Sequence, residues 1–229
     1  MKKFTLFLLL TLVSFANNIG TIMVANGEAQ VKRSANILPI RNGMDILKGD
    51  EIITHKQTRV QVMLNDDTVI TIGANSSFSF LDYMFDGSKK STIQMQATRG
   101  FFRSVTGKIG KIAPERFKVK TKLATIGIRG TDFSAQLGEK TASYICNRGE
   151  ITLKYANIQK SIVAGNKILL HLDGLTVKEL TQAAANGDAK AKALLNEHHK
   201  QIELDTSALA DMNENKVDSK NIKFNCDVN

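Results

Sequence analysis

Apolar and polar residues alternate with a period of two through the middle of this sequence, and this alternation is the feature that most constrains the fold. The clearest example is the segment 116–122, RFKVKTK, in which every second residue is a lysine: Lys118, Lys120 and Lys122. A period of two places successive side chains on opposite faces of a strand. The segment therefore predicts a strand with one buried face and one charged face.

Short runs of the same kind recur, and turn residues such as Asn, Asp and Gly separate them. Besides the lysine-rich segment they are residues 60–64, 69–72, 78–80, 92–96, 101–105, 124–128, 131–135, 141–146 and 151–155. Asn65–Thr68, Arg99-Gly100 and Asn147–Glu150 are expected to be turns between strands. Many short strands at this spacing predict a mainly β fold, with the strands in a twisted sandwich or a β-solenoid-like body. Nothing helical is expected between them, which disfavours alternating strands and helices.

The first sixteen residues have the pattern of a secretory signal peptide. Lys2 and Lys3 precede an almost wholly apolar run, and the small residues of Ser14–Ala16 follow it. The apolar run is too short to span a bilayer comfortably, which takes about 20 residues. We therefore expect residues 1–16 to be cleaved and the protein to be exported to the periplasm.

The remainder of the chain is expected to have three parts. Residues 17–172 hold the strand signals and predict one all-β domain. Residues 173–201 predict a small helical hairpin, because Thr176 begins a capping box and apolar residues follow at helical spacing. Residues 202–229 are polar and acidic and are expected to form a tail.

Positive charge is concentrated in one segment. The full chain has a formal net charge of +9, and residues 88–122 hold ten lysines and arginines against one carboxylate, Glu115. These cations fit either a solvated strand face or a surface for an anionic lipid, lipopolysaccharide or an acidic protein. The candidate surface residues are Lys118, Lys120 and Lys122. A nucleic-acid partner is not expected, since no aromatic residues interleave with these lysines as a single-strand platform requires.

The sequence shows no constellation typical of an enzyme or a metal site. The four histidines form no H-x-x-x-H pattern or Cys/His cluster. No serine lies in a G-x-S-x-G elbow, and no glycine-rich loop ends in G-K-S or G-K-T. We expect no enzymatic activity, no metal and no cofactor. A hydrolase built from scattered residues is kept as a further alternative.

The two cysteines of the chain are Cys146 and Cys226. Export would permit a disulfide between them, which would tie the C-terminal end to the β domain. A buried free Cys146 with an exposed Cys226 fits the sequence equally well, because the sequence does not give the separation of the two Cα atoms.

The segment 124–135, ATIGIRGTDFSA, holds the most specific motif. Gly127 and Gly130 permit a bulge, a bend or a close approach of two backbones. Arg129 lies between them and has two interpretations. A partly buried guanidinium would anchor the bend through its five donors, whereas an exposed one would offer them to an anionic ligand.

This motif resembles the signature of the FecR-type periplasmic domain, which is named after the ferric-citrate signalling regulator. Other segments resemble the turns and strands of that family in the same order: 43–54, 59–72, 75–80, 99–102 and 146–153. The resemblance covers roughly residues 21–170. It gives as family-motif residues Gly127, Arg129, Gly130, Thr131 and Phe133. We interpret them as structural, because they lie at an interior strand bend.

The resemblance implies an all-β periplasmic domain used in signalling or protein interaction, with no known enzymatic chemistry. The iron regulators carry a cytoplasmic anti-sigma segment and a membrane helix before this domain. We expect neither in this chain, and so a stand-alone exported module. The expected function is a non-enzymatic interaction or sensory adaptor that docks a membrane or envelope protein. The alternative is an envelope-binding module that uses the basic strand face of residues 88–122 on lipid or lipopolysaccharide phosphates.

Overall fold

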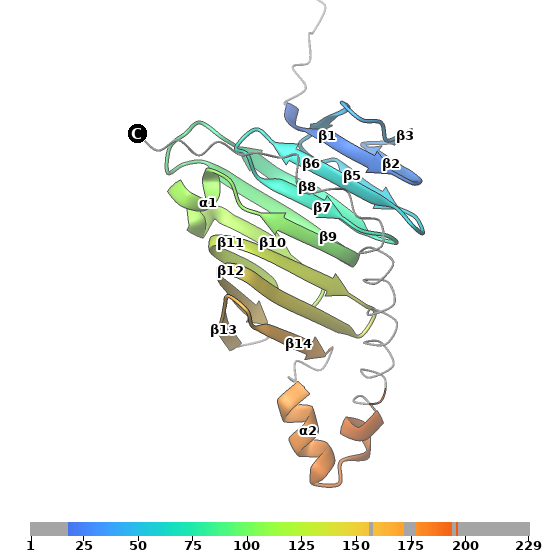
Figure 1. Cartoon of the computed structure of the whole chain (residues 1–229), viewed down its shortest axis with the longest axis vertical. Helices are drawn as coiled ribbons and strands as arrows, with labels where there is room; N and C mark the ends of the chain where they lie inside the picture. Colours follow the sequence, from blue (N-terminus) through green and yellow to red (C-terminus); the bar gives the residue numbers. More distant parts are fainter. Residues whose placement is uncertain (1–17, 156–157, 172–176, 194–195, 197–229) are drawn as a thin grey trace, which may run out of the picture. The chain divides into compact units, whose positions relative to one another are not determined.

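The computed structural model of the protein describes residues 18–155, 158–171, 177–193 and 196 (Figure 1). The chain divides into two compact units, residues 1–174 and residues 175–229. All the strands of the described part belong to the first unit and form one 14-stranded sheet. The prediction of a mainly β fold is confirmed. The expected signal peptide and acidic tail lie outside the described residues.

The strands differ widely in length, and three of them are much longer than the rest. In chain order they are β1 (Asn18–Asn26), β2 (Ala29–Arg33), β3 (Asn36–Pro39), β4 (Asp45–Leu47), β5 (Glu51–Thr54), β6 (Arg59–Leu64), β7 (Val69–Ile72), β8 (Ser77–Met84), β9 (Thr92–Val105), β10 (Phe117–Lys120), β11 (Thr125–Leu137), β12 (Thr141–Tyr155), β13 (Ile158–Val163) and β14 (Lys167–His171).

Two short helical elements follow β9: α1 (Ile109–Ile112) and the 3₁₀ helix η1 (Pro114–Arg116). The expectation that nothing helical lies between the strands is therefore wrong here. Asp66, which is fully buried in the turn between β6 and β7, explains why a helical turn forms. Its carboxylate accepts a hydrogen bond from the backbone N of Ile109 at 3.1 Å and satisfies a donor at the first turn of α1.

Where apolar and polar residues alternate strictly, the predicted strands are present. β6 and β7 form the expected hairpin, and Asp67 in its turn has a φ of 65°. On β10, Phe117 and Val119 are fully buried while Lys118 and Lys120 are exposed. Burying an aromatic or branched apolar side chain contributes about 1.5–3 kcal/mol, so the alternation fixes which face of β10 packs on the core.

Two expected turns, Arg99-Gly100 and Asn147–Glu150, are instead bends inside long strands, and these predictions are wrong. The bend expected in the segment 124–135 is present inside β11. β9, β11 and β12 each run through a segment where two strands with a turn or bend between them were expected. The bends coincide with glycines of positive φ: Gly100 at 82°, Gly130 at 58° and Gly149 at 80°. Glycine adopts this conformation at little cost, so the same residue type serves in a hairpin turn or in a bend.

The bend also changes which side chains face the core. On β12, residues 142, 144 and 146 are buried before Gly149, and residues 151, 153 and 155 are buried after it. The buried set moves from even to odd numbers. An extra residue in one strand of a pair has this effect, because side chains alternate with a period of two. The register of β11 against β12 is irregular between Arg129 and Asp132, at the same place.

The long strands change partners at their bends. Residues 92–99 of β9 pair with β8, and residues 93–96 also pair with β10, which runs parallel to β9. Residues 100–105 of β9 pair with β11 and residues 102–105 also with β7. Both halves send side chains into one hydrophobic core, so the branched sheet encloses a single core (Figure 1).

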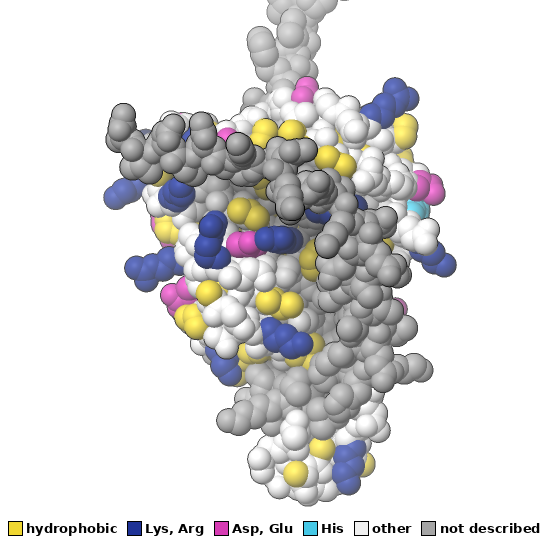
Figure 2. Space-filling model, in the orientation of Figure 1, with side chains coloured by type: hydrophobic (Ala, Val, Ile, Leu, Met, Phe, Trp, Pro, Cys, Tyr) yellow, Lys and Arg dark blue, Asp and Glu magenta, His cyan; other side chains and the backbone are white. Residues whose placement is uncertain are grey.

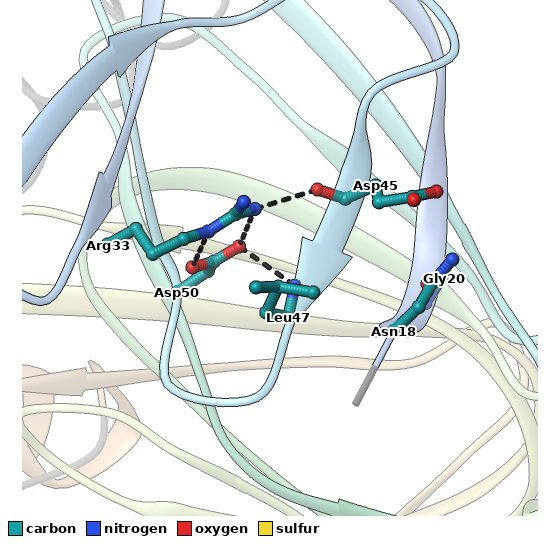
Figure 3. Close-up of polar contacts among 6 residues, drawn as sticks. All are labelled: Asn18, Gly20, Arg33, Asp45, Leu47 and Asp50. Carbon is teal, nitrogen blue, oxygen red and sulfur yellow. Dashed lines mark hydrogen bonds and ion pairs between the residues drawn. The ribbon is translucent and has the colours of Figure 1, made fainter. Parts of the chain in front are cut away.

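An ion pair between a partly exposed arginine and a buried aspartate joins β2 to the turn between β4 and β5 (Figure 3). Arg33 on β2 donates to the carboxylate of Asp50 through Nε at 2.9 Å and through a terminal nitrogen at 2.7 Å. The same carboxylate accepts from the backbone N of Leu47 at 2.8 Å. Asp50 is fully buried, so removing Arg33 would leave an uncompensated charge at a cost of about 3–5 kcal/mol. The sequence did not indicate this pair.

The second unit contains α2 (Val177–Ala185). Gly187, with a φ of 94°, follows the end of α2 as predicted. Asp188 then caps a further helical turn, since its Oδ1 accepts from the backbone N of Lys190 at 2.9 Å. The capping box of Thr176 lies outside the described residues. No helix in the part of the chain that the structure describes is long and apolar enough to cross a membrane.

Candidate functional site

The family motif lies entirely on β11, and part of it belongs to the core. Phe133 is fully buried and packs edge-on against Phe102 of β9, with ring centroids 5.9 Å apart. Thr131 is also buried, and its backbone N donates to Oγ1 of Thr106 at 2.9 Å. The backbone N of Thr106 donates in return to the carbonyl oxygen of Thr131 at 2.9 Å. These contacts tie the bend of β11 to the end of β9.

A glycine of the neighbouring strand β12 packs closely against the bend of β11. Gly130 has a φ of 58°, and a Cβ there would have open space around it. Across from it, a Cβ on Gly149 would lie 2.2 Å from the carbonyl oxygen of Gly130 and 3.0 Å from that of Arg129. Such a contact is too short to exist without movement of the backbone. The bend therefore requires glycine at Gly149 for two reasons, its φ and the close approach of two chains.

Arg129 is exposed. Its side chain has no hydrogen-bond or ion-pair partner among the described residues. These features are the ones expected of a guanidinium that is available to an anionic ligand, not of one that anchors the bend. The acid of the same motif is bound by another arginine.

Asp132 is that acid, and Arg103 of β9 holds it through two hydrogen bonds, 2.8 Å from Nε and 2.6 Å from a terminal nitrogen. Asn147 of β12 donates to Asp132 Oδ1 at 3.2 Å. The hydrogen bonds from Arg103 lower the pKa of Asp132, and burial opposes them in part. The three side chains connect β9, β11 and β12 beside the bend. The sequence did not indicate this cluster, because its members are far apart along the chain.

Next to the bend, the strand register brings cationic and small polar side chains onto one face. Lys118 pairs with Gly127, which pairs with Thr152. Lys120 pairs with Thr125, which pairs with Lys154. Paired residues on neighbouring strands point to the same side of a sheet.

Arg129 lies two residues beyond Gly127 and so points to this same side. We call this surface the basic face and define it as Lys118, Lys120, Thr125, Gly127, Arg129, Thr152 and Lys154. Lys154 joins the face only through the register of β12, and the sequence did not indicate it.

The rest of the cationic segment 88–122 is distributed over several elements. The prediction that this segment forms one basic strand face is therefore wrong. All ten of its lysines and arginines are exposed. Lys108 forms an ion pair with Asp67 at 3.0 Å. Lys122 lies beyond the end of β10, and its Nζ donates to the carbonyl oxygen of Glu139 at 3.1 Å. Figure 2 shows lysine and arginine side chains at separate places over the visible face, with hydrophobic, acidic and other surface between them.

Cys146 is fully buried on β12. Burial raises the pKa of its thiol. Its Sγ is 3.4 Å from the carbonyl oxygen of Gly149. Cys226 lies outside the described residues, so a bridge between the two stays a prediction.

In the described part of the chain, no three His, Cys, Asp or Glu side chains come together in a group that could hold a metal ion.

Comparison with known proteins gives one family and several partial structural likenesses. Two crystal structures of a candidate anti-sigma factor from Parabacteroides distasonis ATCC 8503, at 2.50 and 1.65 Å resolution, match with TM-scores of 0.46 and 0.45. Each is 16% identical to this chain, and each match covers 55% of this chain and 57% of the chain in the crystal structure. A cell surface anchoring domain is 26% identical, with a TM-score of 0.26. The match covers 27% of this chain and 82% of that domain's chain.

The present chain thus spans little more than half the length of the anti-sigma factor that it resembles. No curated protein matches the sequence. The family model described as "FecR protein" matches residues 50–152, which include the motif on β11 and the whole of β10. The likeness to the FecR family therefore depends on the family model, which matches residues 50–152 of this chain.

Proposed function

We propose that this protein is a non-enzymatic signalling adaptor of the FecR type, which docks a membrane or envelope protein in the periplasm. The observation that carries the proposal is the FecR match over residues 50–152. The match covers the strands that form both the bend and most of the basic face, up to Thr152. The regulatory character of the family supports an adaptor over an enzyme.

The geometry of the domain supports the same function. An adaptor needs an exposed surface whose shape is held by rigid elements, and sites on strands are held more firmly than sites on loops. Arg129 and the lysines of β10 stand on strands whose other faces are buried in the core. The signal-peptide pattern of residues 1–16 supports export, and an exported adaptor would meet its partner in the envelope.

Crosslinking in the native envelope tests the proposal. The mature chain, tagged at its C-terminus, is crosslinked in an envelope fraction, recovered and washed at low and high salt, with the tag alone as the control. We expect one specific membrane protein to remain bound at high salt. Recovery of only lipid or lipopolysaccharide, lost at high salt, would contradict the adaptor and favour the envelope-binding alternative.

A further inference from the structure

Gly127 occupies a position on β11 where the fold does not require a glycine. Its φ lies outside the left-handed region, and a Cβ there would meet only Thr152, at 3.9 Å from the carbonyl oxygen and 4.0 Å from Cβ. Those are ordinary van der Waals distances. A glycine in the middle of a strand lowers stability relative to alanine. Folding therefore gives no reason for this residue.

The effect of Gly127 is on the surface. It points outward in the row that runs from Lys118 to Thr152. Without a side chain, it leaves the backbone uncovered between these two residues. Thr125 and Thr152, two of its four nearest outward neighbours, are small. The centre of the basic face is thus lower than its margins.

Four cations surround this low centre. Outward residues on one strand are about 7 Å apart and neighbouring strands are about 4.8 Å apart, so Lys118, Lys120, Lys154 and Arg129 all lie within about 10 Å of Gly127. None of the four has a hydrogen-bond or ion-pair partner in the described part of the chain. Glu150, which pairs with Arg129 in the register, faces the same way, and the outward Asp132 farther along β11 is already held by Arg103. Several unpaired like charges around a glycine with small neighbours favour an anionic occupant.

The absence of apolar side chains among these cations favours a protein occupant over a lipid surface. Lipid-binding surfaces combine basic residues with apolar residues that enter the headgroup region. Of the described residues, none of the exposed large apolar side chains lies on β10, β11 or β12. Val163 of β13 is at the margin, opposite Glu150. The threonine hydroxyls offer hydrogen bonds instead.

We propose that the basic face is the docking surface of this FecR domain, and that it binds an acidic segment of a partner protein with a carboxylate over Gly127. The inference rests on the proposed adaptor function and names the chemistry of its partner. The carboxylates pair with the lysines and Arg129, and the bare backbone at Gly127 allows the segment to approach the sheet.

A labelled oligoglutamate peptide is the first probe, with its binding to the mature full chain followed by fluorescence anisotropy at low salt. The test variant combines K118E, K120E and K154E. The control combines K32E, K56E and K167E, which make the same change of charge at exposed lysines elsewhere. We expect on the order of tenfold weaker binding for the test variant and less than about twofold for the control. Equal loss in both variants overturns the inference, because only net charge would then matter.

A second variant separates the role of Gly127 from the charges. In G127V the added side chain covers the low centre without altering charge. We expect weaker peptide binding with an unchanged or raised midpoint of thermal unfolding. Unchanged binding overturns the part of the inference that concerns Gly127. Vesicles with anionic headgroups form a separate arm, and binding to vesicles without binding to the peptide overturns the choice of a protein partner.

The envelope crosslinking distinguishes failure of this inference from failure of the adaptor function. If the wild-type chain captures a specific membrane protein and the K118E/K120E/K154E variant captures it equally well, the adaptor function holds and the docking face is elsewhere. If the wild-type chain captures no specific protein, both proposals fail together.

Discussion

Two neighbouring stretches of β11 contain glycine for opposite reasons. At the bend, Gly130 has positive φ, and Gly149 of β12 lies so close to it that any side chain would collide. Three residues earlier, Gly127 has ordinary backbone angles and room for a side chain. The glycines of the bend are explained by folding alone. Gly127 is explained by the proposed partner segment, which must approach the surface of the sheet.

This difference teaches how to separate structure from function within one family motif. Residues required by the fold should lower stability when they are changed, while residues of the basic face should lower binding and leave stability intact. Four substitutions test this division, from the largest expected change in stability to the smallest.

Replacing Phe133 by alanine should have the largest effect. The side chain is fully buried against Phe102, so its removal leaves a cavity and should reduce the free energy of unfolding by about 3–5 kcal/mol. Urea denaturation measures the change. Val163→Ala is the control, since Val163 is 54% exposed and its truncation should cost less than about 0.5 kcal/mol. Similar losses in both variants would contradict the assignment of Phe133 to the core.

Gly149→Ala should come next, with a loss of about 3 kcal/mol. The new Cβ would have both an unfavourable φ and a clash with the carbonyl oxygen of Gly130. Gly130→Ala carries only the unfavourable φ, and we expect about 1 kcal/mol from the same urea titration. If the two variants are equally stable, the close contact between β11 and β12 does not constrain the bend.

Asp132→Asn should have a smaller effect that depends on pH. The folded-state pKa of Asp132 is lowered by Arg103, so the pair stabilises the protein above the unfolded pKa of about 3.9 and loses this contribution as the pH falls through the folded value. Half of the Arg103 side chain is exposed, so we expect only about 1 kcal/mol at neutral pH.

Stability curves of the wild type and Asp132→Asn should therefore converge on acidification. Measuring denaturant midpoints from pH 7 to pH 2 shows whether they do. A difference that stays constant over this range would mean that the carboxylate charge is not what Arg103 recognises.

Local patterns in the sequence predicted many of the strands and the bend of β11, but not the bends of β9 and β12. β6 and β10 were predicted because their buried and exposed positions alternate, and alternation reports which side of a strand is buried. The turns expected at Gly100 and Gly149 were wrong because a glycine of positive φ serves in a hairpin or in a bent strand. Only the long-range pairing of β9, β11 and β12 decides between the two.

The candidate site shows the same limit. Exposure of Lys118 and Lys120 followed from alternation within β10, but their neighbour Lys154 depends on the register of two strand pairs. The contact of Arg103 with Asp132 also joins residues that are distant in the sequence. Sequence patterns could indicate which side chains face solvent, but not which of them share a face.

Gly127→Ala tests the central claim most directly, because stability and binding should respond differently to one methyl group. We predict that the free energy of unfolding stays the same or rises by about 0.5 kcal/mol, since alanine is favoured over glycine in a strand. The affinity for the oligoglutamate peptide should fall in the same preparation. A clear loss of stability would show that Gly127 belongs to the fold, as Gly149 does, and would contradict the account.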